Sequence, residues 1–149
     1  MSKKNLFKYA EKCLYDYVKN TARLDVIKED LRVMRITGDV HAQQYDGVNS
    51  QSGEHSDPVF GHVAKIERKE EQIQKLERIT QPITNMVKIL KDSAEKGSVQ
   101  NKELLDILQL RYFDKLPNDV IQDELKLTHS TFYNRRYSLV YMAVSFLGL

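Results

Sequence analysis

Residues 116–146 read LPNDVIQDELKLTHSTFYNRRYSLVYMAVSF, and this stretch decides the fold. Apolar residues recur along it at steps of three, four and seven, which is the spacing of one face of an α-helix. They are Val120, Ile121, Leu125, Leu127, Phe132, Leu139, Val140 and Ala143. Pro117 is tolerated only near a helix start, because it has no N–H to donate. The pattern therefore predicts two helices joined by a tight turn at Leu127, with one buried seam crossing both.

The start of the second helix decides which of its side chains face outward. We expect the first helix to begin near Asn118 and the second at His129. Thr128 is the expected N-cap, because its hydroxyl can accept a hydrogen bond from the free N–H of Ser130 or Thr131. Residues three and four apart are neighbours on a helix, so an inward Phe132 turns another set of residues outward together. That set is His129, Ser130, Tyr133, Asn134 and Tyr137.

These outward side chains can all form hydrogen bonds, which suits them to the edges of DNA bases. Asn pairs bidentately with adenine in the major groove, and Arg135 and Arg136 are suited to phosphate or guanine. No acidic residue occurs from Leu127 to Leu149, whereas a helix that is merely solvated usually mixes Glu among its Arg residues. The candidate DNA-binding residues are Lys126, Thr128, His129, Ser130, Tyr133, Asn134, Arg135, Arg136 and Tyr137.

The same region resembles a known family. The resemblance is carried by Leu110–Phe113 (LRYF), Val120 and Ile121, Leu125–Leu127 (LKL) and Thr128–Arg136 (THSTFYNRR). These runs are similar to the C-terminal region of the RinA/ArpU group of phage late-gene transcription regulators, which itself resembles the promoter-reading helix-turn-helix of bacterial sigma factors. Gln122 departs from the small Ala usual in the motif, and Lys126 departs from the usual Gly. Lys126 must therefore adopt a left-handed conformation if the turn keeps its shape.

The rest of the chain also reads as helical. Amphipathic stripes predict helices over residues 4–18, 22–36, 62–79, 83–96 and 101–113, and no strand pattern occurs. The first two helices either pair as a hairpin or continue as one bent rod, and a break or bend is expected at Thr80–Pro82. Residues 37–61 hold four of the six glycines and are expected to form a flexible segment, after a helix end at Thr37–Gly38.

Together these patterns predict an all-α protein in two parts. Residues 1–97 are expected to form a helical N-terminal and oligomerisation region, with a helical hairpin and a central long helix. Residues 98–149 are expected to form the DNA-binding domain with the sigma-like helix-turn-helix.

The central helix leaves two interpretations of assembly open. Near the a and d positions of a heptad lie Ile66, Ile73, Leu76, Ile83, Val87 and Leu90. This spacing is typical of a coiled-coil dimer, but Lys69, Thr80 and Pro82 interrupt it. Packing against the N-terminal helices of the same chain explains the pattern equally well. A dimer is also expected because one recognition helix reads only about four or five base pairs.

Composition limits the class of protein. The chain has 149 residues, of which 41% are hydrophobic and 30% charged, and it contains no apolar run near the roughly 18 residues that span a bilayer. No secretory signal follows Lys3 and Lys4, and the single cysteine, Cys13, agrees with a reducing compartment, so a cytoplasmic protein is expected. The resemblance to phage regulators implies that this cytoplasm is that of a bacterial host. Residues 1–36 hold nine Lys or Arg against five Asp or Glu, a surplus that either assists phosphate binding or only solvates the helix.

Motifs of catalysis are missing from the sequence. It contains no phosphate-binding glycine loop, nucleophile elbow or Cys-x-x-Cys pair, and we expect no enzyme activity, cofactor or metal. The expected function is a sequence-specific transcription regulator, and the resemblance implies a phage late-gene activator, with double-stranded DNA and host RNA polymerase as partners. Two alternatives stay open: a DNA-packaging subunit of the small-terminase type, and a helical module that contacts RNA polymerase.

Overall fold

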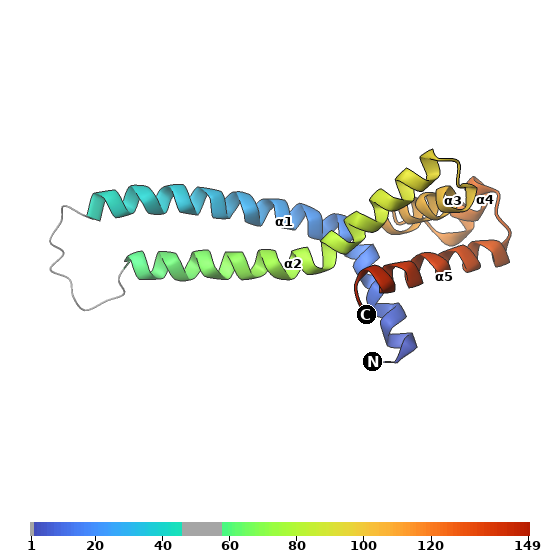
Figure 1. Cartoon of the computed structure of the whole chain (residues 1–149), viewed down its shortest axis with the longest axis horizontal. Coiled ribbons are helices and arrows are strands. Elements are labelled where there is room, and N and C mark those ends of the chain that lie inside the picture. The colour runs from blue at the N-terminus through green and yellow to red at the C-terminus, as the bar shows by residue number, and fades with distance from the viewer. Residues whose placement is uncertain (1, 46–57) are drawn as a thin grey trace. The chain divides into compact units, whose positions relative to one another are not determined.

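The computed structural model describes residues 2–45 and 58–149, and every element within them is a helix (Figure 1). The elements are α1 (Lys3–Tyr45), α2 (Pro58–Glu95), α3 (Val99–Ile107), the π-helical segment η1 (Leu108–Phe113), α4 (Asn118–Leu125) and α5 (His129–Phe146). The all-α prediction is confirmed. None of these helices combines the length and the apolar character that crossing a membrane requires.

The chain divides into two compact units that share the long helices α1 and α2. The core unit contains Met1–Asn20 and Arg78–Leu149, and the hairpin unit contains Thr21–Glu77. The expected division lay between residues 97 and 98. Instead, the first turns of α1 and the last turns of α2 group with residues 98–149, because their apolar faces belong to one hydrophobic core.

Helix α1 runs without a break through Asn20 and Thr21, so the two helices predicted over residues 4–36 are one helix. Each of these residues costs at most about 0.7 kcal/mol relative to Ala in a helix, too little to interrupt it. The helix also passes Gly38, where we expected its end, and reaches Tyr45. Of the expected flexible segment, residues 37–45 and 58–61 are helical, and residues 46–57 lie outside the described part of the chain.

Helix α2 likewise continues through the expected break, with Pro82 inside it. Proline cannot donate to the carbonyl four residues back, and this costs about 3 kcal/mol in a helix interior. Thr80, Ile83 and Met86 around it are buried, and the Thr84 hydroxyl donates to the Thr80 carbonyl at 3.1 Å. Burial of these side chains on both sides of the proline offsets its cost.

In the hairpin unit, α1 and α2 lie side by side and run antiparallel (Figure 1). Leu24, Ile27 and Leu31 are buried along α1. Three ion pairs join the helices: Lys28 to Glu77 at 3.1 Å, Arg35 to Glu70 at 2.8 Å and Lys69 to Asp30 at 3.6 Å. Lys69 occupies a heptad position of α2, so this seam faces α1 of the same chain. The N-terminal hairpin is therefore formed by α1 with α2, and the dimer stays a prediction.

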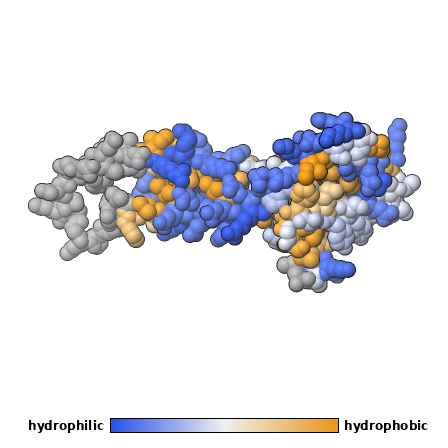
Figure 2. All heavy atoms as spheres, in the orientation of Figure 1, coloured by the Kyte–Doolittle hydropathy of each residue, from blue (hydrophilic) through white to orange (hydrophobic). Residues whose placement is uncertain are grey.

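Apolar side chains also remain exposed on the hairpin unit, where orange atoms lie among blue ones in Figure 2. They are Val26, Val33, Ile36, Phe60 and Val63. Two paired helices bury only the faces that meet, so side chains on the other faces stay in solvent.

The core unit is organised around α3, which packs against both α4 and α5. Its buried side chains come from every helix: Ala10, Cys13, Leu14, Ile83, Met86, Leu90, Leu104, Ile107, Leu108, Tyr112, Ile121, Phe132, Leu139, Val140 and Ala143. The predicted seam is confirmed at its α5 positions and at Ile121. Val120 was wrongly placed on it and is 44% exposed, because adjacent residues on a helix point about 100° apart.

The helix predicted over residues 101–113 begins earlier than expected and becomes π-helical before its predicted end at Phe113. It begins at Val99, because Ser98 caps it by accepting a hydrogen bond from the Asn101 N–H at 3.3 Å. Its last part, η1, is π-helical, and the Asp114 N–H donates to the Gln109 carbonyl five residues back at 2.8 Å. A π-turn shifts the side chains after it relative to an α-helix, and Tyr112 within it is fully buried.

The turn between α4 and α5 has the predicted form. Lys126 adopts the left-handed conformation with φ 55° and ψ 43°, and the Leu127 N–H donates to the Gln122 carbonyl at 3.0 Å. The Thr128 hydroxyl accepts from the Thr131 N–H at 3.2 Å, which caps α5. The helices begin at Asn118 and His129, the residues that the sequence indicated.

Lys126→Gly should raise the free energy of unfolding by about 0.5–1 kcal/mol. Glycine removes the left-handed penalty of roughly 1–2 kcal/mol, but its greater conformational entropy in the unfolded chain offsets part of this gain. Equilibrium urea denaturation measures the change. Lys91→Gly, at an exposed position inside α2, is the matched control. It should lower the free energy of unfolding by about 1 kcal/mol, because glycine is unfavourable in a right-handed helix. Destabilisation by both substitutions would contradict a left-handed Lys126.

Candidate nucleic-acid interface

The first two turns of α5 present a polar outer face. His129, Ser130 and Asn134 are exposed on it, and Lys126 and Thr128 are exposed at the turn that precedes it. Thr128 uses its hydroxyl to cap the helix. Five of the nine candidate residues are therefore exposed at the N-terminal end of α5 or in the turn before it.

The two candidate tyrosines take part in packing as well. The Tyr133 ring lies against the His129 ring, with 4.4 Å between centroids, and its hydroxyl oxygen accepts from Asn118 Nδ2 at 3.3 Å. The Tyr137 ring contacts the Phe7 ring, with 5.3 Å between centroids, although 47% of the residue stays exposed. Tyr133 thus supports the start of α5, whereas Tyr137 keeps one side in solvent.

Both candidate arginines hold carboxylates of the same chain. Arg135 Nε donates to Glu103 of α3 at 2.8 Å, and these side chains are 29% and 27% exposed. Arg136 donates from Nε at 3.0 Å and from Nη2 at 2.8 Å to Glu11 of α1, and both side chains are only 16% exposed. The arginines therefore lie on the two inner flanks of α5 instead of beside its outer face. Their carboxylate partners are 32 and 125 positions away in sequence, so no local pattern pointed to them.

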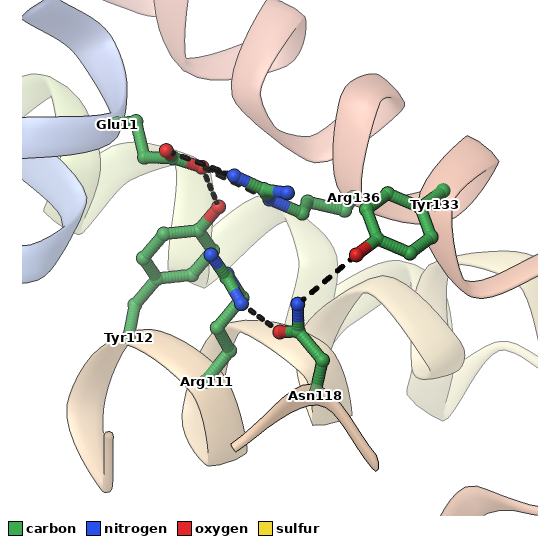
Figure 3. A network of polar contacts seen from close by, with 6 residues as sticks. All are labelled: Glu11, Arg111, Tyr112, Asn118, Tyr133 and Arg136. Atoms are coloured by element: carbon green, nitrogen blue, oxygen red, sulfur yellow. Dashed lines mark hydrogen bonds and ion pairs between the residues drawn. The ribbon is translucent and has the colours of Figure 1, made fainter. Parts of the chain in front are cut away.

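Glu11 is the centre of a polar network that joins three helices (Figure 3). Its carboxylate accepts from the Tyr112 hydroxyl at 2.6 Å as well as from Arg136. Burial raises the pKa of Tyr112, and the hydrogen bond to Glu11 and the charge of Glu11 raise it further. Tyr112 therefore stays protonated and donates, so the carboxylate is satisfied by a neutral and a charged donor.

A second chain of contacts runs from η1 through α4 to α5 in the same view (Figure 3). Arg111 donates to Asn118 Oδ1, and Asn118 Nδ2 donates onward to the Tyr133 hydroxyl at 3.3 Å. The Arg111 guanidinium also lies 5.6 Å from the centroid of the Tyr15 ring, within the range of a cation–π contact. These contacts fix the start of α4 relative to the start of α5.

The first turns of α1 lie against α5, which the sequence did not predict. Phe7 contacts the rings of Tyr137 and Tyr141, with 5.3 Å and 5.7 Å between centroids. Ala10 is buried in the same core, and Glu11 binds Arg136. The amphipathic stripe of residues 4–18 indicated a buried face, but nothing in it identified α5 as the partner.

The described residues show no other obvious site. No group of three or more His, Cys, Asp or Glu within them is placed to hold a metal ion. Cys13 is buried in the core, and burial raises the pKa of its thiol. Comparisons with protein-family models, with curated proteins and with solved structures return no match.

Arg136→Ala should lower the free energy of unfolding by about 2–4 kcal/mol, a little under the 3–5 kcal/mol typical of breaking a fully buried pair, because Glu11 keeps its bond to Tyr112 and some solvent contact. Arg135→Ala is the matched control on the adjacent residue. Its pair with Glu103 is more exposed, so the loss should be about 1 kcal/mol or less. Chemical denaturation of both variants makes the comparison, and equal losses would contradict the special position of Arg136.

Proposed function

We propose that the chain is a sequence-specific double-stranded DNA-binding protein in which the N-terminal half of α5 enters the major groove. The observation that carries this is the arrangement of α4, the left-handed Lys126 and the cap at Thr128, which turns His129, Ser130 and Asn134 outward. A polar, acid-free helix end of this kind, preceded by a short helix and a tight turn, matches the requirements of a helix-turn-helix.

The side chains at this end suit base recognition. The major groove is about 12 Å wide and accepts an α-helix. The Asn134 amide can donate to N7 and accept from the amino group of one adenine, and Ser130 can donate or accept with any base. His129 begins the helix and lies closest to its positive dipole end, which also favours approach to the phosphates.

The charges around α4 limit how the helix pair meets DNA. Asp119, Asp123 and Glu124 of α4 are exposed, so their side of α4 faces away from the phosphates in the proposed complex. Lys126 at the turn is the cation adjacent to the proposed reading face. DNA is therefore approached by the turn and the start of α5, and not by the outer side of α4.

The resemblance of residues 110–136 to RinA/ArpU regulators suggests transcription control by a phage protein in the host cytoplasm. One helix that reads about four or five base pairs needs a second copy or a polymerase on the same DNA to find its site. We therefore include a homodimer, or host RNA polymerase, in the proposal.

A second candidate function is contact with a protein such as RNA polymerase. The observation that favours it is the exposure of Tyr137 and Tyr141, which are 47% and 50% exposed on α5. Tyrosine is enriched in protein interfaces. In this alternative the C-terminal half of α5, and not its start, carries the function.

Selection of bound duplexes from a random DNA pool tests the proposal and supplies the site for further work. On the selected site, Asn134→Ala should lower the affinity by about 1–3 kcal/mol, roughly 5- to 150-fold, because a bidentate base contact is lost. The dependence of binding on salt should stay unchanged, since no phosphate contact is removed. Fluorescence anisotropy over a salt series measures both quantities.

Ser145→Ala, an exposed polar position in the last turn of the same helix, is the control and should bind as the wild type does. Equal binding by wild type and Asn134→Ala would show that Asn134 makes no base contact. If no duplex is enriched, the protein-contact alternative becomes the better account of α5.

A further inference from the structure

The proposed reading helix has no unpaired cation of its own. Half to two-thirds of protein–DNA hydrogen bonds go to phosphate and sugar, so a DNA reader needs positive side chains beside its base contacts. From residue 127 to the C-terminus the basic residues other than His129 are Arg135 and Arg136. Both are held by carboxylates of the same chain. Apart from Lys126 at the turn, positive charge for the phosphates must come from another segment.

The segment fixed against the exposed side of α5 is the start of α1. Phe7 contacts Tyr137 and Tyr141, both of which keep about half of their surface in solvent. One turn later, Glu11 makes the ion pair with Arg136. Two contacts four residues apart fix both the position and the rotation of this part of α1 on α5.

Lys4 and Lys8 lie on the same side of α1 as these contacts. Lys4 precedes Phe7 by three residues, and Lys8 precedes Glu11 by three and follows Lys4 by four, so the lysines are neighbours of the contact residues on the helix surface. Both are exposed, and the described part of the chain shows no ion pair to either.

No acidic residue competes with these lysines. Residues 1–10 contain no Asp or Glu, and the first acid, Glu11, already accepts from Arg136 and Tyr112. Residues 127–149 are also free of acids. Packing of the two segments therefore creates a surface on which free positive charge comes from α1 and uncharged hydrogen-bonding groups come from α5.

We propose that Lys4 and Lys8 bind phosphates of the DNA backbone that flanks the groove entered by α5. This inference rests on the proposed function and adds a second element to it: α5 recognises bases, and α1 supplies the cations that attach and orient the duplex. Tyr137 and Tyr141, half-exposed beside Phe7, carry hydroxyls that can donate to the same backbone.

The test is the salt dependence of DNA binding by the full chain, measured on the selected duplex and on an unrelated duplex of equal length. Each phosphate contact contributes about 0.9 to the slope of log affinity against log salt. Lys4→Ala with Lys8→Ala should therefore reduce the slope by about 1.8 and weaken binding to both duplexes by a similar factor. Lys4→Arg with Lys8→Arg should keep the wild-type slope, because arginine also binds phosphate.

Lys88→Ala with Lys91→Ala removes the same charge from exposed positions of α2 and is the matched control. It should leave the slope unchanged, and thermal unfolding of all variants checks that each is folded. A wild-type slope in the Lys4 and Lys8 alanine variant overturns this inference while DNA binding stands. A similar loss in the α2 control shows a general charge effect and also overturns it. If wild type binds neither duplex at low salt, the proposed function falls together with the inference.

Discussion

The carboxylate of Glu11 makes the contact on which the core unit depends. It joins α1 to Tyr112 of η1, 101 residues away, and to Arg136 of α5, 125 residues away. Hydrogen bonds between a guanidinium and a carboxylate are strong and directional when two nitrogens take part, as they do here. A charge enclosed in this way is costly to leave without its partner. The three helices are therefore held in one arrangement.

The direction of the Arg136 side chain determines which other side chains of α5 face outward. With Arg136 toward α1 and Arg135 toward Glu103 of α3, the buried seam lies between them and the outer face is left to His129, Ser130 and Asn134. Base-reading groups and backbone-binding cations are then carried by different helices in the proposed complex. This division corresponds to the roles of the two kinds of contact, since phosphate contacts set position and base contacts set sequence preference.

Stability of the long helices depends on packing more than on local preference. Helix α1 includes Asn20, Thr21 and Gly38, and α2 includes Pro82, all of which disfavour helix locally. Isolated helices in water are marginal, and most of their stability in proteins comes from burying an apolar face. Leu24, Ile27 and Leu31 supply that face in the hairpin unit, and Leu14, Ile83 and Met86 supply it in the core unit. Buried positions on both sides of Asn20, Thr21 and Pro82 keep the two helices continuous there.

The sequence alone determined the features that depend on neighbours a few residues apart. The start of α4 after Pro117, the left-handed Lys126, the Thr128 cap and the buried positions of α5 follow from steric limits and hydrogen bonds within one or two turns. Only the tertiary structure decided the partners of the arginines, the packing of Phe7 on α5 and the union of α1 and α2 with the C-terminal helices. An arginine beside a polar helix face looks the same in sequence whether its carboxylate partner is absent or lies 125 residues away, because folding alone brings that partner within 3 Å.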